Sequence, residues 1–179
     1  MLSRFAPFLL AVGAFLIDRL TKWIIRVHVT LWDNIVVIPG FFSIVHAENR
    51  GAAFGFLSES TSPLRTAFLV GVSGVVMLLI CYALWNPGRV GLGDGWISRC
   101  GLACILGGAA GNLFDRMTSG TVTDFLEFYF GSYQFPAFNA ADTAITVGAG
   151  LLLMEMWLTR HQKPGHRPAV APHGGDGGR

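Results

Sequence analysis

Between Gly107 and Asp142 the chain reads GGAAGNLFDRMTSGTVTDFLEFYFGSYQFPAFNAAD. The stretch begins at the end of one long apolar segment and ends where the next one starts. Its polar side chains include Asn112, Asp115, Arg116, Asp124, Asn139 and Asp142. Polar residues are scarce in this chain, so their concentration between two segments of membrane length predicts a functional site here.

The composition indicates an integral membrane protein. Of the 179 residues, 52% are hydrophobic and 13% are charged, whereas a typical soluble domain has about 25% charged residues. The 23 glycines agree, because transmembrane helices tolerate glycine better than soluble helices do. The length allows one compact domain, which we place at residues 1–160. No basic stripe with interleaved aromatic residues suggests a nucleic-acid partner.

We predict a mainly α-helical bundle of four transmembrane helices. The spans cover about residues 6–28, 66–85, 96–114 and 138–158. The second is the clearest, because the segment from Thr66 to Trp85 holds 20 residues without a charge. At about 1.5 Å per residue this length matches a hydrocarbon core of about 30 Å.

The first span has an alternative interpretation. Phe5–Ile17 is an apolar run of 13 residues that follows Arg4, as in a secretory signal peptide, whose apolar region has roughly 7–15 residues. However, no convincing A-x-A cleavage site follows, and the run continues as DRLTKWII to about Val29. We therefore interpret it as a retained span that carries Asp18 and Lys22 in its second half.

Two longer connections, at about residues 30–63 and 116–137, are predicted to lie outside the membrane. The first is too long to be a simple turn. Within it, Asn34–Ile38 and Phe41–His46 are rich in β-branched and aromatic residues and flank Pro39-Gly40. Such runs around a Pro-Gly breaker predict a small β-sheet in this connection. The second connection is predicted to be a loop.

The positive charges orient the bundle by a narrow margin. With the amino terminus inside, seven Lys and Arg residues lie inside and six outside. The cluster of Arg160, Lys163 and Arg167 after the last span favours both termini in the cytoplasm. Residues 161–179, rich in proline, glycine and histidine, are predicted to be a disordered cytoplasmic tail.

This topology brings the unexplained polar residues to one end of the bundle. They are Asp18, Asn49, Asn112, Asp115, Asp124, Asn139 and Asp142. Charged residues at membrane depth are costly and usually mark function, although each one alone could simply lie in the headgroup region. The common location of the whole set predicts an active site near the outer face.

The residue types favour carboxylate chemistry. Asn112-x-x-Asp115 and Asn139-x-x-Asp142 place an amide and a carboxyl three residues apart on one helix face. Two nearby carboxyls share a proton, so that one can activate water and the other can protonate a leaving amine. No Ser/His/Asp set, no HExxH motif and no defined metal site appear. The repeated pattern alone would pair Asp115 with Asp142.

Five ordered motifs closely resemble the lipoprotein signal peptidase family, the type II signal peptidases. They read DRLTK (18–22), NRGAAFG (49–55), GGAAGNLFDR (107–116), VTDF (122–125) and FNAAD (138–142). The motifs extend from about Leu10 to Trp157, and as an ordered set they are highly specific.

The resemblance implies an aspartyl endopeptidase of the bacterial inner membrane. Proteins of this family remove the signal peptide from diacylglyceryl-modified prolipoproteins, cutting just before the lipidated cysteine. The implied partners are the prolipoprotein, membrane lipid and the cyclic peptide inhibitor globomycin. No metal or organic cofactor is implied.

By similarity, Asp124 and Asp142 are the catalytic pair. The supporting residues are Asp18, Lys22, Asn49, Gly51, Asn112, Asp115, Arg116, Asn139 and Ala141. We prefer Asp124 to Asp115 for a second reason. Arg116 follows Asp115 and would keep that carboxyl ionised, whereas Asp124 has no neighbouring cation in sequence and is expected on a mobile loop.

Two non-enzymatic alternatives use the same residues. A proton-coupled transporter subunit could use the carboxylates as a relay, but it should carry polar residues through its full depth. Spans two to four carry few polar side chains below their outer ends. A structural membrane scaffold would have no need for these outward-facing Asn and Asp residues. We therefore favour the peptidase.

Overall fold

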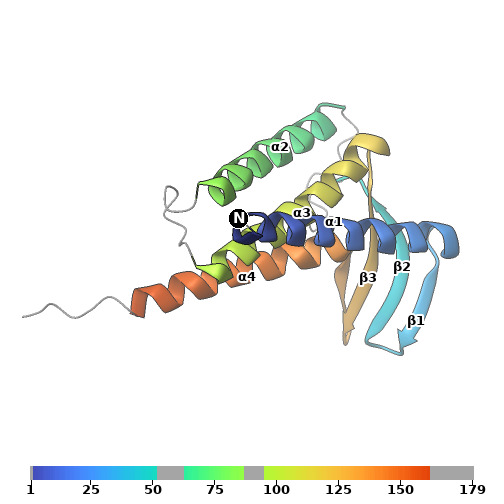
Figure 1. Cartoon of the computed structure of the whole chain (residues 1–179). Helices are drawn as coiled ribbons and strands as arrows, with labels where there is room; N and C mark the ends of the chain where they lie inside the picture. The colour runs from blue at the N-terminus through green and yellow to red at the C-terminus, as the bar shows by residue number, and fades with distance from the viewer. Residues whose placement is uncertain (1, 52–62, 87–94, 162–179) are drawn as a thin grey trace, which may run out of the picture.

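The structure is a computed structural model that describes residues 2–51, 63–86 and 95–161 (Figure 1). Its elements follow the order α1 (Leu2–His28), β1 (Asn34–Ile38), β2 (Phe42–Asn49), α2 (Pro63–Trp85), α3 (Trp96–Thr118), β3 (Val122–Phe130), β4 (Tyr133–Phe138) and α4 (Ala140–His161). The fold is thus mainly helical with a small antiparallel sheet. The tail predicted at 161–179 lies, beyond His161, outside the described residues.

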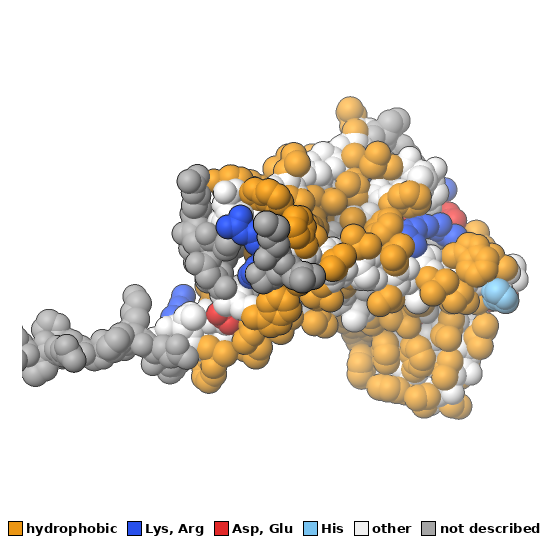
Figure 2. Space-filling model, in the orientation of Figure 1, with side chains coloured by type: hydrophobic (Ala, Val, Ile, Leu, Met, Phe, Trp, Pro, Cys, Tyr) orange, Lys and Arg blue, Asp and Glu red, His pale blue; other side chains and the backbone are white. Residues whose placement is uncertain are grey.

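Three of the described helices are long and apolar enough to cross a membrane, at Leu64–Trp85, Trp96–Thr118 and Ala140–Arg160. They correspond to the second, third and fourth predicted spans. Helix α1 has 27 residues and is not among these three; its second half carries Asp18 and several basic side chains. Hydrophobic side chains cover most of the visible surface (Figure 2).

Helix α3 lies at the centre of the bundle, between α1 and α4 on one side and α2 on the other (Figure 1). Small residues allow the close approach of α4. A Cβ atom on Gly101 would lie 2.8 Å from the carbonyl oxygen of Gly148, and one on Gly108 would lie 2.9 Å from Cγ1 of Ile145. Side chains at these positions would push the helices apart, as expected for glycine-packed membrane helices.

An apolar core joins α2 to α3 and α1. Its buried members are Ala11, Ile80, Ala83, Leu84, Leu102, Ala103 and Leu106. Helix α2 otherwise diverges from α1 (Figure 1), and α3 packs more extensively against α4 and α1 than against α2. The bundle therefore consists of a tightly packed trio, α1, α3 and α4, with α2 attached to one side.

The sheet has the strand order β1-β2-β3-β4, with each neighbouring pair antiparallel. Gly40 and Gly131, with φ of 71° and 64°, lie in the turns of its two hairpins, where glycine adopts a left-handed conformation at no steric cost. The small β-sheet predicted in the first connection is confirmed.

The second connection was predicted to be a loop, and that prediction is wrong. Strands β3 and β4 occupy most of it. Strand β3 has no simple alternation of buried and exposed residues, since Val122 to Phe125 are all buried. A segment covered on both faces lacks the period of two that would reveal a strand in the sequence.

The sheet lies at one end of the bundle, beside the second half of α1, the end of α3 and the start of α4 (Figure 1). A small apolar cluster of Ile25, Val29 and Phe125 fixes β3 against α1. This arrangement brings both connections, and the polar residues they carry, to the same end of the helices.

Candidate active site

Asp142 lies in the first turn of α4 and is held by the residue that precedes the helix. The backbone N–H of Asp142 donates to Oδ1 of Asn139 (3.0 Å), and the backbone N–H of Asn139 donates to Oδ2 of Asp142 (3.3 Å). This is a reciprocal helix cap, which satisfies two amide groups at the helix start. The Asn-x-x-Asp spacing therefore fixes the rotamer of Asp142.

Asp124 lies within β3, between β2 and β4, and is 3% exposed. The prediction that it lies on a mobile loop is therefore wrong. Its carboxyl accepts hydrogen bonds from Nδ2 of Asn49 on β2 (3.1 Å) and Nδ2 of Asn139 (2.6 Å). Asn139 thus contacts both Asp124 and Asp142 and joins the strand to the helix.

Asn112 on α3 completes the amide frame. Its Nδ2 donates to Oδ1 of Asp142 (2.8 Å), and its Oδ1 accepts from Nζ of Lys22 (2.9 Å) and from Nδ2 of Asn139 (3.3 Å). A lysine ammonium can only donate, so Lys22 fixes the orientation in which the amide nitrogen of Asn112 faces Asp142. Asn112 is thus bonded to Asp142 and not to Asp115, its partner in the sequence repeat.

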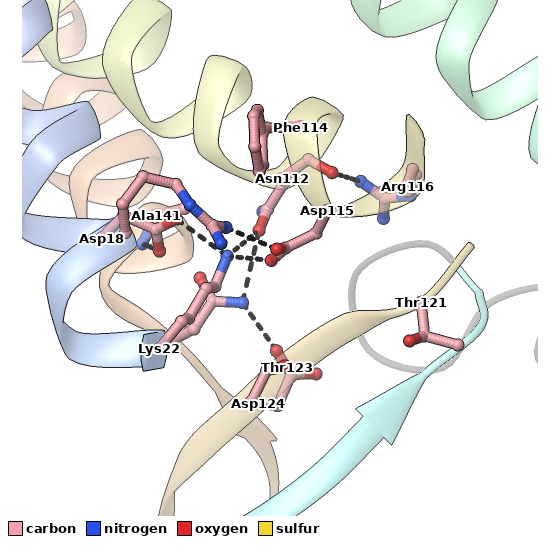
Figure 3. A network of polar contacts seen from close by, with 12 residues as sticks. Asp18, Lys22, Asn112, Phe114, Asp115, Arg116, Thr121, Thr123, Asp124 and Ala141 are labelled. Atoms are coloured by element: carbon pink, nitrogen blue, oxygen red, sulfur yellow. Dashed lines mark hydrogen bonds and ion pairs between the residues drawn. The ribbon is translucent and has the colours of Figure 1, made fainter. Parts of the chain in front are cut away.

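Asp115 is surrounded by cations (Figure 3). Arg19 forms an ion pair with its Oδ1, Nζ of Lys22 lies 2.8 Å from its Oδ2, and a guanidinium nitrogen of Arg26 lies 2.9 Å from its Oδ1. All three cations come from α1. Arg116 does not contribute, because neighbouring helix residues point in different directions.

Lys22 and Asp18 anchor α1 to the start of α4. Both side chains are fully buried, and Nζ of Lys22 lies 2.9 Å from Oδ2 of Asp18. The other carboxylate oxygen of Asp18 accepts the backbone N–H of Ala141 at 2.9 Å. A side chain at Gly111 would collide with Asp18, so this glycine leaves the space for the carboxylate.

Arg116 and Gly51 form a separate link at the edge of the site. Arg116 donates to the carbonyl oxygen of Gly51 (3.0 Å) and to that of Asn112 (3.4 Å). The backbone N–H of Gly51 donates to Oδ1 of Asn49 (2.8 Å), which orients the amide nitrogen of Asn49 toward Asp124.

The structure therefore brings together every residue that the sequence analysis selected. It adds Arg19, Arg26 and Thr123, which that analysis missed. Nε of Arg26 donates to Oγ1 of Thr123 (2.8 Å), the residue directly before Asp124. One signal was available, because Arg19, Lys22 and Arg26 recur at helical spacing on one face of α1.

The two carboxyls of the site share one cavity. Burial and, to a smaller extent, the negative charge of Asp142 raise the pKa of Asp124, the hydrogen bonds from Asn49 and Asn139 lower it, and the net result is a pKa of about 7. A cavity of about 180 Å³ is lined by both aspartates, Asn49 and Phe138, among others. Within the described residues, no group of three or more His, Cys, Asp or Glu side chains could hold a metal ion.

Such a site can carry out hydrolysis. A carboxyl that is protonated near neutral pH can donate a proton, and a second carboxyl beside it can accept one. The groups that donate hydrogen bonds to these carboxyls are neutral amides, which orient the carboxyls without neutralising them.

Comparisons with known proteins find similar sequences over most of the chain. Residues 10–158 match the family model described as signal peptidase (SPase) II. A lipoprotein signal peptidase of Solibacter usitatus is 46% identical over 159 residues, covering 89% of this chain and 94% of that protein. One from Symbiobacterium thermophilum is 39% identical, covering 86% of this chain and 95% of that protein.

Solved structures show the same fold. A bacterial membrane enzyme with 27% sequence identity matches with a TM-score of 0.77, covering 90% of this chain and 93% of that one. A second bacterial membrane enzyme, 29% identical, matches with a TM-score of 0.69 and covers 84% of this chain and 91% of that one.

Proposed function

The chain belongs to the signal peptidase II family, and we propose that it is an aspartyl endopeptidase that removes the signal peptide from bacterial prolipoproteins, cutting just before the lipidated cysteine. The observation that carries this proposal is the shared amide. Asn139 contacts both Asp124 and Asp142, and the two aspartates line one cavity at the end of the helices.

In the proposed mechanism, Asp142 acts as the base and Asp124 as the acid. Asp142 takes a proton from water as the water oxygen attacks the scissile carbonyl carbon. Asp124 is protonated near neutral pH and gives its proton to the leaving nitrogen as the C–N bond breaks. Transfer of the proton from Asp142 to Asp124 then restores the starting state.

The remaining residues support this pair. Asn49, Asn112 and Asn139 orient the carboxyls, while Arg116 and Gly51 hold Asn49 in place. The buried charges of Asp18, Lys22 and Asp115, together with the backbone of Ala141, fix α1 against α3 and α4. None of these roles requires a metal or an organic cofactor.

We further propose that α1 is a fourth span, that the protein lies in the inner membrane with both termini in the cytoplasm, and that the site lies near the outer face. Helix α1 has 27 residues, enough at about 1.5 Å each to cross a core of about 30 Å. Its charged residues Asp18 and Lys22 are fully buried against the bundle. If a cysteine at Asn86 reacts with an impermeant reagent added from outside, this topology is wrong.

The decisive experiment for the function is cleavage of a prolipoprotein by the purified protein in detergent or nanodiscs. The lipid-modified precursor should be cut, with Asp124→Asn as the inactive control, and a globomycin-type inhibitor should block the reaction. The unmodified precursor should be cut far more slowly. Equal rates on both precursors would remove the lipid requirement, and no cleavage of either would refute the proposed function.

A further inference from the structure

Strand β2 has an open edge near its end. Strand β3 pairs with β2 as far as Asn49, whereas β1, on the other side, pairs with it only as far as Val45. The backbone N–H of Trp32 adds one bond on that side, to the carbonyl oxygen of His46 (2.9 Å). Beyond His46, no strand of the described residues lies on the β1 side of β2. The last residues of β2 therefore present an edge to which a further strand could be added.

Glu48 is the residue whose backbone faces this open edge. In a strand, successive residues direct their N–H and C=O groups to opposite sides. The carbonyl oxygen of His46 faces the β1 side, because it accepts the N–H of Trp32, so Glu48, two residues farther on, faces the same side. The N–H and C=O groups of Glu48 can therefore pair with an incoming strand while β2 keeps its bonds to β3.

A cavity of about 550 Å³ lies along this edge, and we call it the β2-edge cavity. Its lining residues are Leu31, Trp32, Glu48, Asn49 and Arg50. Asn49 also lines the cavity that contains Asp124 and Asp142, so the two cavities adjoin at this residue. The exposed side chains of Glu48 and Arg50 carry opposite charges, so the β2-edge cavity does not select its occupant by net charge.

Trp32 lies beside the open edge in a strained conformation. Its φ is 71°, in the left-handed region that a residue with a bulky side chain rarely adopts. The residue is nevertheless 71% exposed, so packing among the described residues does not account for the strain. Strained residues cluster at binding sites, and an exposed indole beside an open strand edge offers a flat surface to an extended chain.

We propose that the β2-edge cavity binds the first residues of the mature chain, which follow the lipidated cysteine, as an additional strand on β2. This inference rests on the proposed function and identifies how the outer side of the site recognises its substrate. From the scissile bond beside Asp124 on β3, the mature chain crosses β2 to reach the open edge. That path is about two strand spacings, or about 10 Å, which about three extended residues cover.

Pairing through the main chain fits this substrate better than recognition of side chains does. Strand addition uses backbone hydrogen bonds, which every sequence can form, and a peptidase that acts on different prolipoproteins meets different mature sequences. An acyl chain in the same place would leave the N–H and C=O groups of Glu48 without partners.

The first test moves one N-methyl group along the mature chain of a lipid-modified precursor that has about eight mature residues. Only alternate residues of an added strand donate to its neighbour. Wild type in nanodiscs should therefore show a KM about tenfold higher when every second position between about mature residues 4 and 7 is methylated, and little change at the positions between them. The value of kcat should stay the same, because these positions are remote from the scissile bond.

The second test changes the protein. Wild type should bind the long precursor with a KM about tenfold lower than that of a precursor cut short after mature residue 2. Glu48→Pro removes the N–H group at the open edge, where proline is tolerated because no bond to β3 is lost. This variant should remove the difference in KM between the two precursors.

A further variant separates binding from folding. Trp32→Gly removes the indole and relieves the strained φ, so its thermal stability should not fall, whereas its KM for the long precursor should rise about threefold. It also provides the result if Glu48→Pro fails to fold. Trp23→Ala is the matched control, since Trp23 is 57% exposed on α1 and does not line the cavity, and it should keep the wild-type difference in KM.

Four results would overturn the added strand and leave the proposed function standing. They are an N-methyl scan without alternation, equal wild-type KM values for the two precursors, and an unchanged difference in KM in both variants. The fourth is an equal rise in KM for both precursors in a folded variant, which would mean that the cavity holds a lipid headgroup instead of the mature chain. Failure of wild type to cut either lipid-modified precursor would instead refute the proposed function.

Discussion

Two groups of buried carboxyls lie side by side at the end of the bundle and differ in their partners. Asp115 is bonded to Arg19, Lys22 and Arg26. Asp124 and Asp142 accept hydrogen bonds from the neutral amides of Asn49, Asn112 and Asn139, and Asp142 also accepts the backbone N–H of Asn139. We call these the ion cluster and the amide-bound pair.

This difference distinguishes a cluster that stabilises the fold from a pair that can transfer protons. A buried carboxylate that pairs with several cations stays charged. Removal of either partner strongly destabilises the protein, because it leaves a buried charge without a counterion. Carboxyls that accept hydrogen bonds only from neutral groups can share a proton, as the pKa of about 7 at Asp124 indicates. In the ion cluster three cations face the two carboxylates Asp18 and Asp115, and the excess positive charge helps the neighbouring pair to keep one negative charge.

The largest effect is expected in the amide-bound pair. Asp124→Asn and Asp142→Asn each remove a proton carrier, and turnover should fall by about a thousandfold or more. The fold should not suffer, because the amide fills the same space and leaves no buried cation unpaired. Mass-spectrometric cleavage assays and thermal unfolding in detergent measure the two effects.

The contrasting substitution in the ion cluster is Asp115→Asn. It leaves three cations on α1 with Asp18 as their remaining carboxylate, and the protein should lose about 3–5 kcal/mol of stability as well as activity. Asp33→Asn, at an exposed turn position, is the matched control and should change neither. If Asp115→Asn is folded and inactive while Asp124→Asn still cleaves, the catalytic pair is Asp115 with Asp142.

A smaller effect is expected where the ion cluster meets β3. Arg26 bonds both Asp115 and Thr123, so Arg26→Gln releases the strand beside Asp124 and should lower kcat about tenfold, equivalent to about 1.4 kcal/mol. Arg19 contacts Asp115 and lies over the Phe114 ring without touching β3, so Arg19→Gln should affect stability alone.

Arg26→Lys separates the two contributions of Arg26. A lysine can pair with Asp115 but lacks the fork that reaches Thr123 as well. It should therefore restore stability more fully than kcat. Equal kcat values for the Arg19→Gln and Arg26→Gln proteins would show that the link to Thr123 does not position Asp124.

The sequence predicted the helices well because their signal is local. The segment from Thr66 to Trp85 has no charge over 20 residues, and the structure places α2 at Pro63–Trp85. The predicted third span, 96–114, stops one turn before the end of α3 at Thr118. The predicted span ends just before Asp115 and Arg116, whose charges are satisfied by other elements, and the helix continues past them.

The strands and the ion cluster were harder to predict because their causes are not local. Strand β3 is covered on both faces, which hides its periodicity. Arg19 and Arg26 resemble ordinary basic residues near a membrane surface until α3 brings Asp115 to them across about 90 residues of chain. In contrast, the Asn139-x-x-Asp142 pair is a local helix cap, whereas Asn112, at the same spacing from Asp115, bonds Asp142 instead.

The smallest expected effect is a shift of the pH profile in Asn49→Ala. The proposed mechanism needs Asp124 protonated, so activity should fall as the pH rises through the pKa of about 7. The amide of Asn49 donates to Asp124 and favours its ionised form, so its removal should raise that pKa. The basic limb of the kcat/KM profile should therefore move to higher pH. The shift should be smaller than one pH unit, where one unit corresponds to about 1.4 kcal/mol.

Glu48→Ala is the matched control for this shift. Glu48 is the neighbouring residue on β2, is exposed and pairs with Thr123 rather than Asp124 in the sheet, so the limb should stay in place. The direction of the shift in Asn49→Ala matters more than its size. If the acid limb of the Asn49→Ala profile instead moves to higher pH while the basic limb stays fixed, Asp124 works in its ionised form. The acid and base roles of Asp124 and Asp142 would then be exchanged.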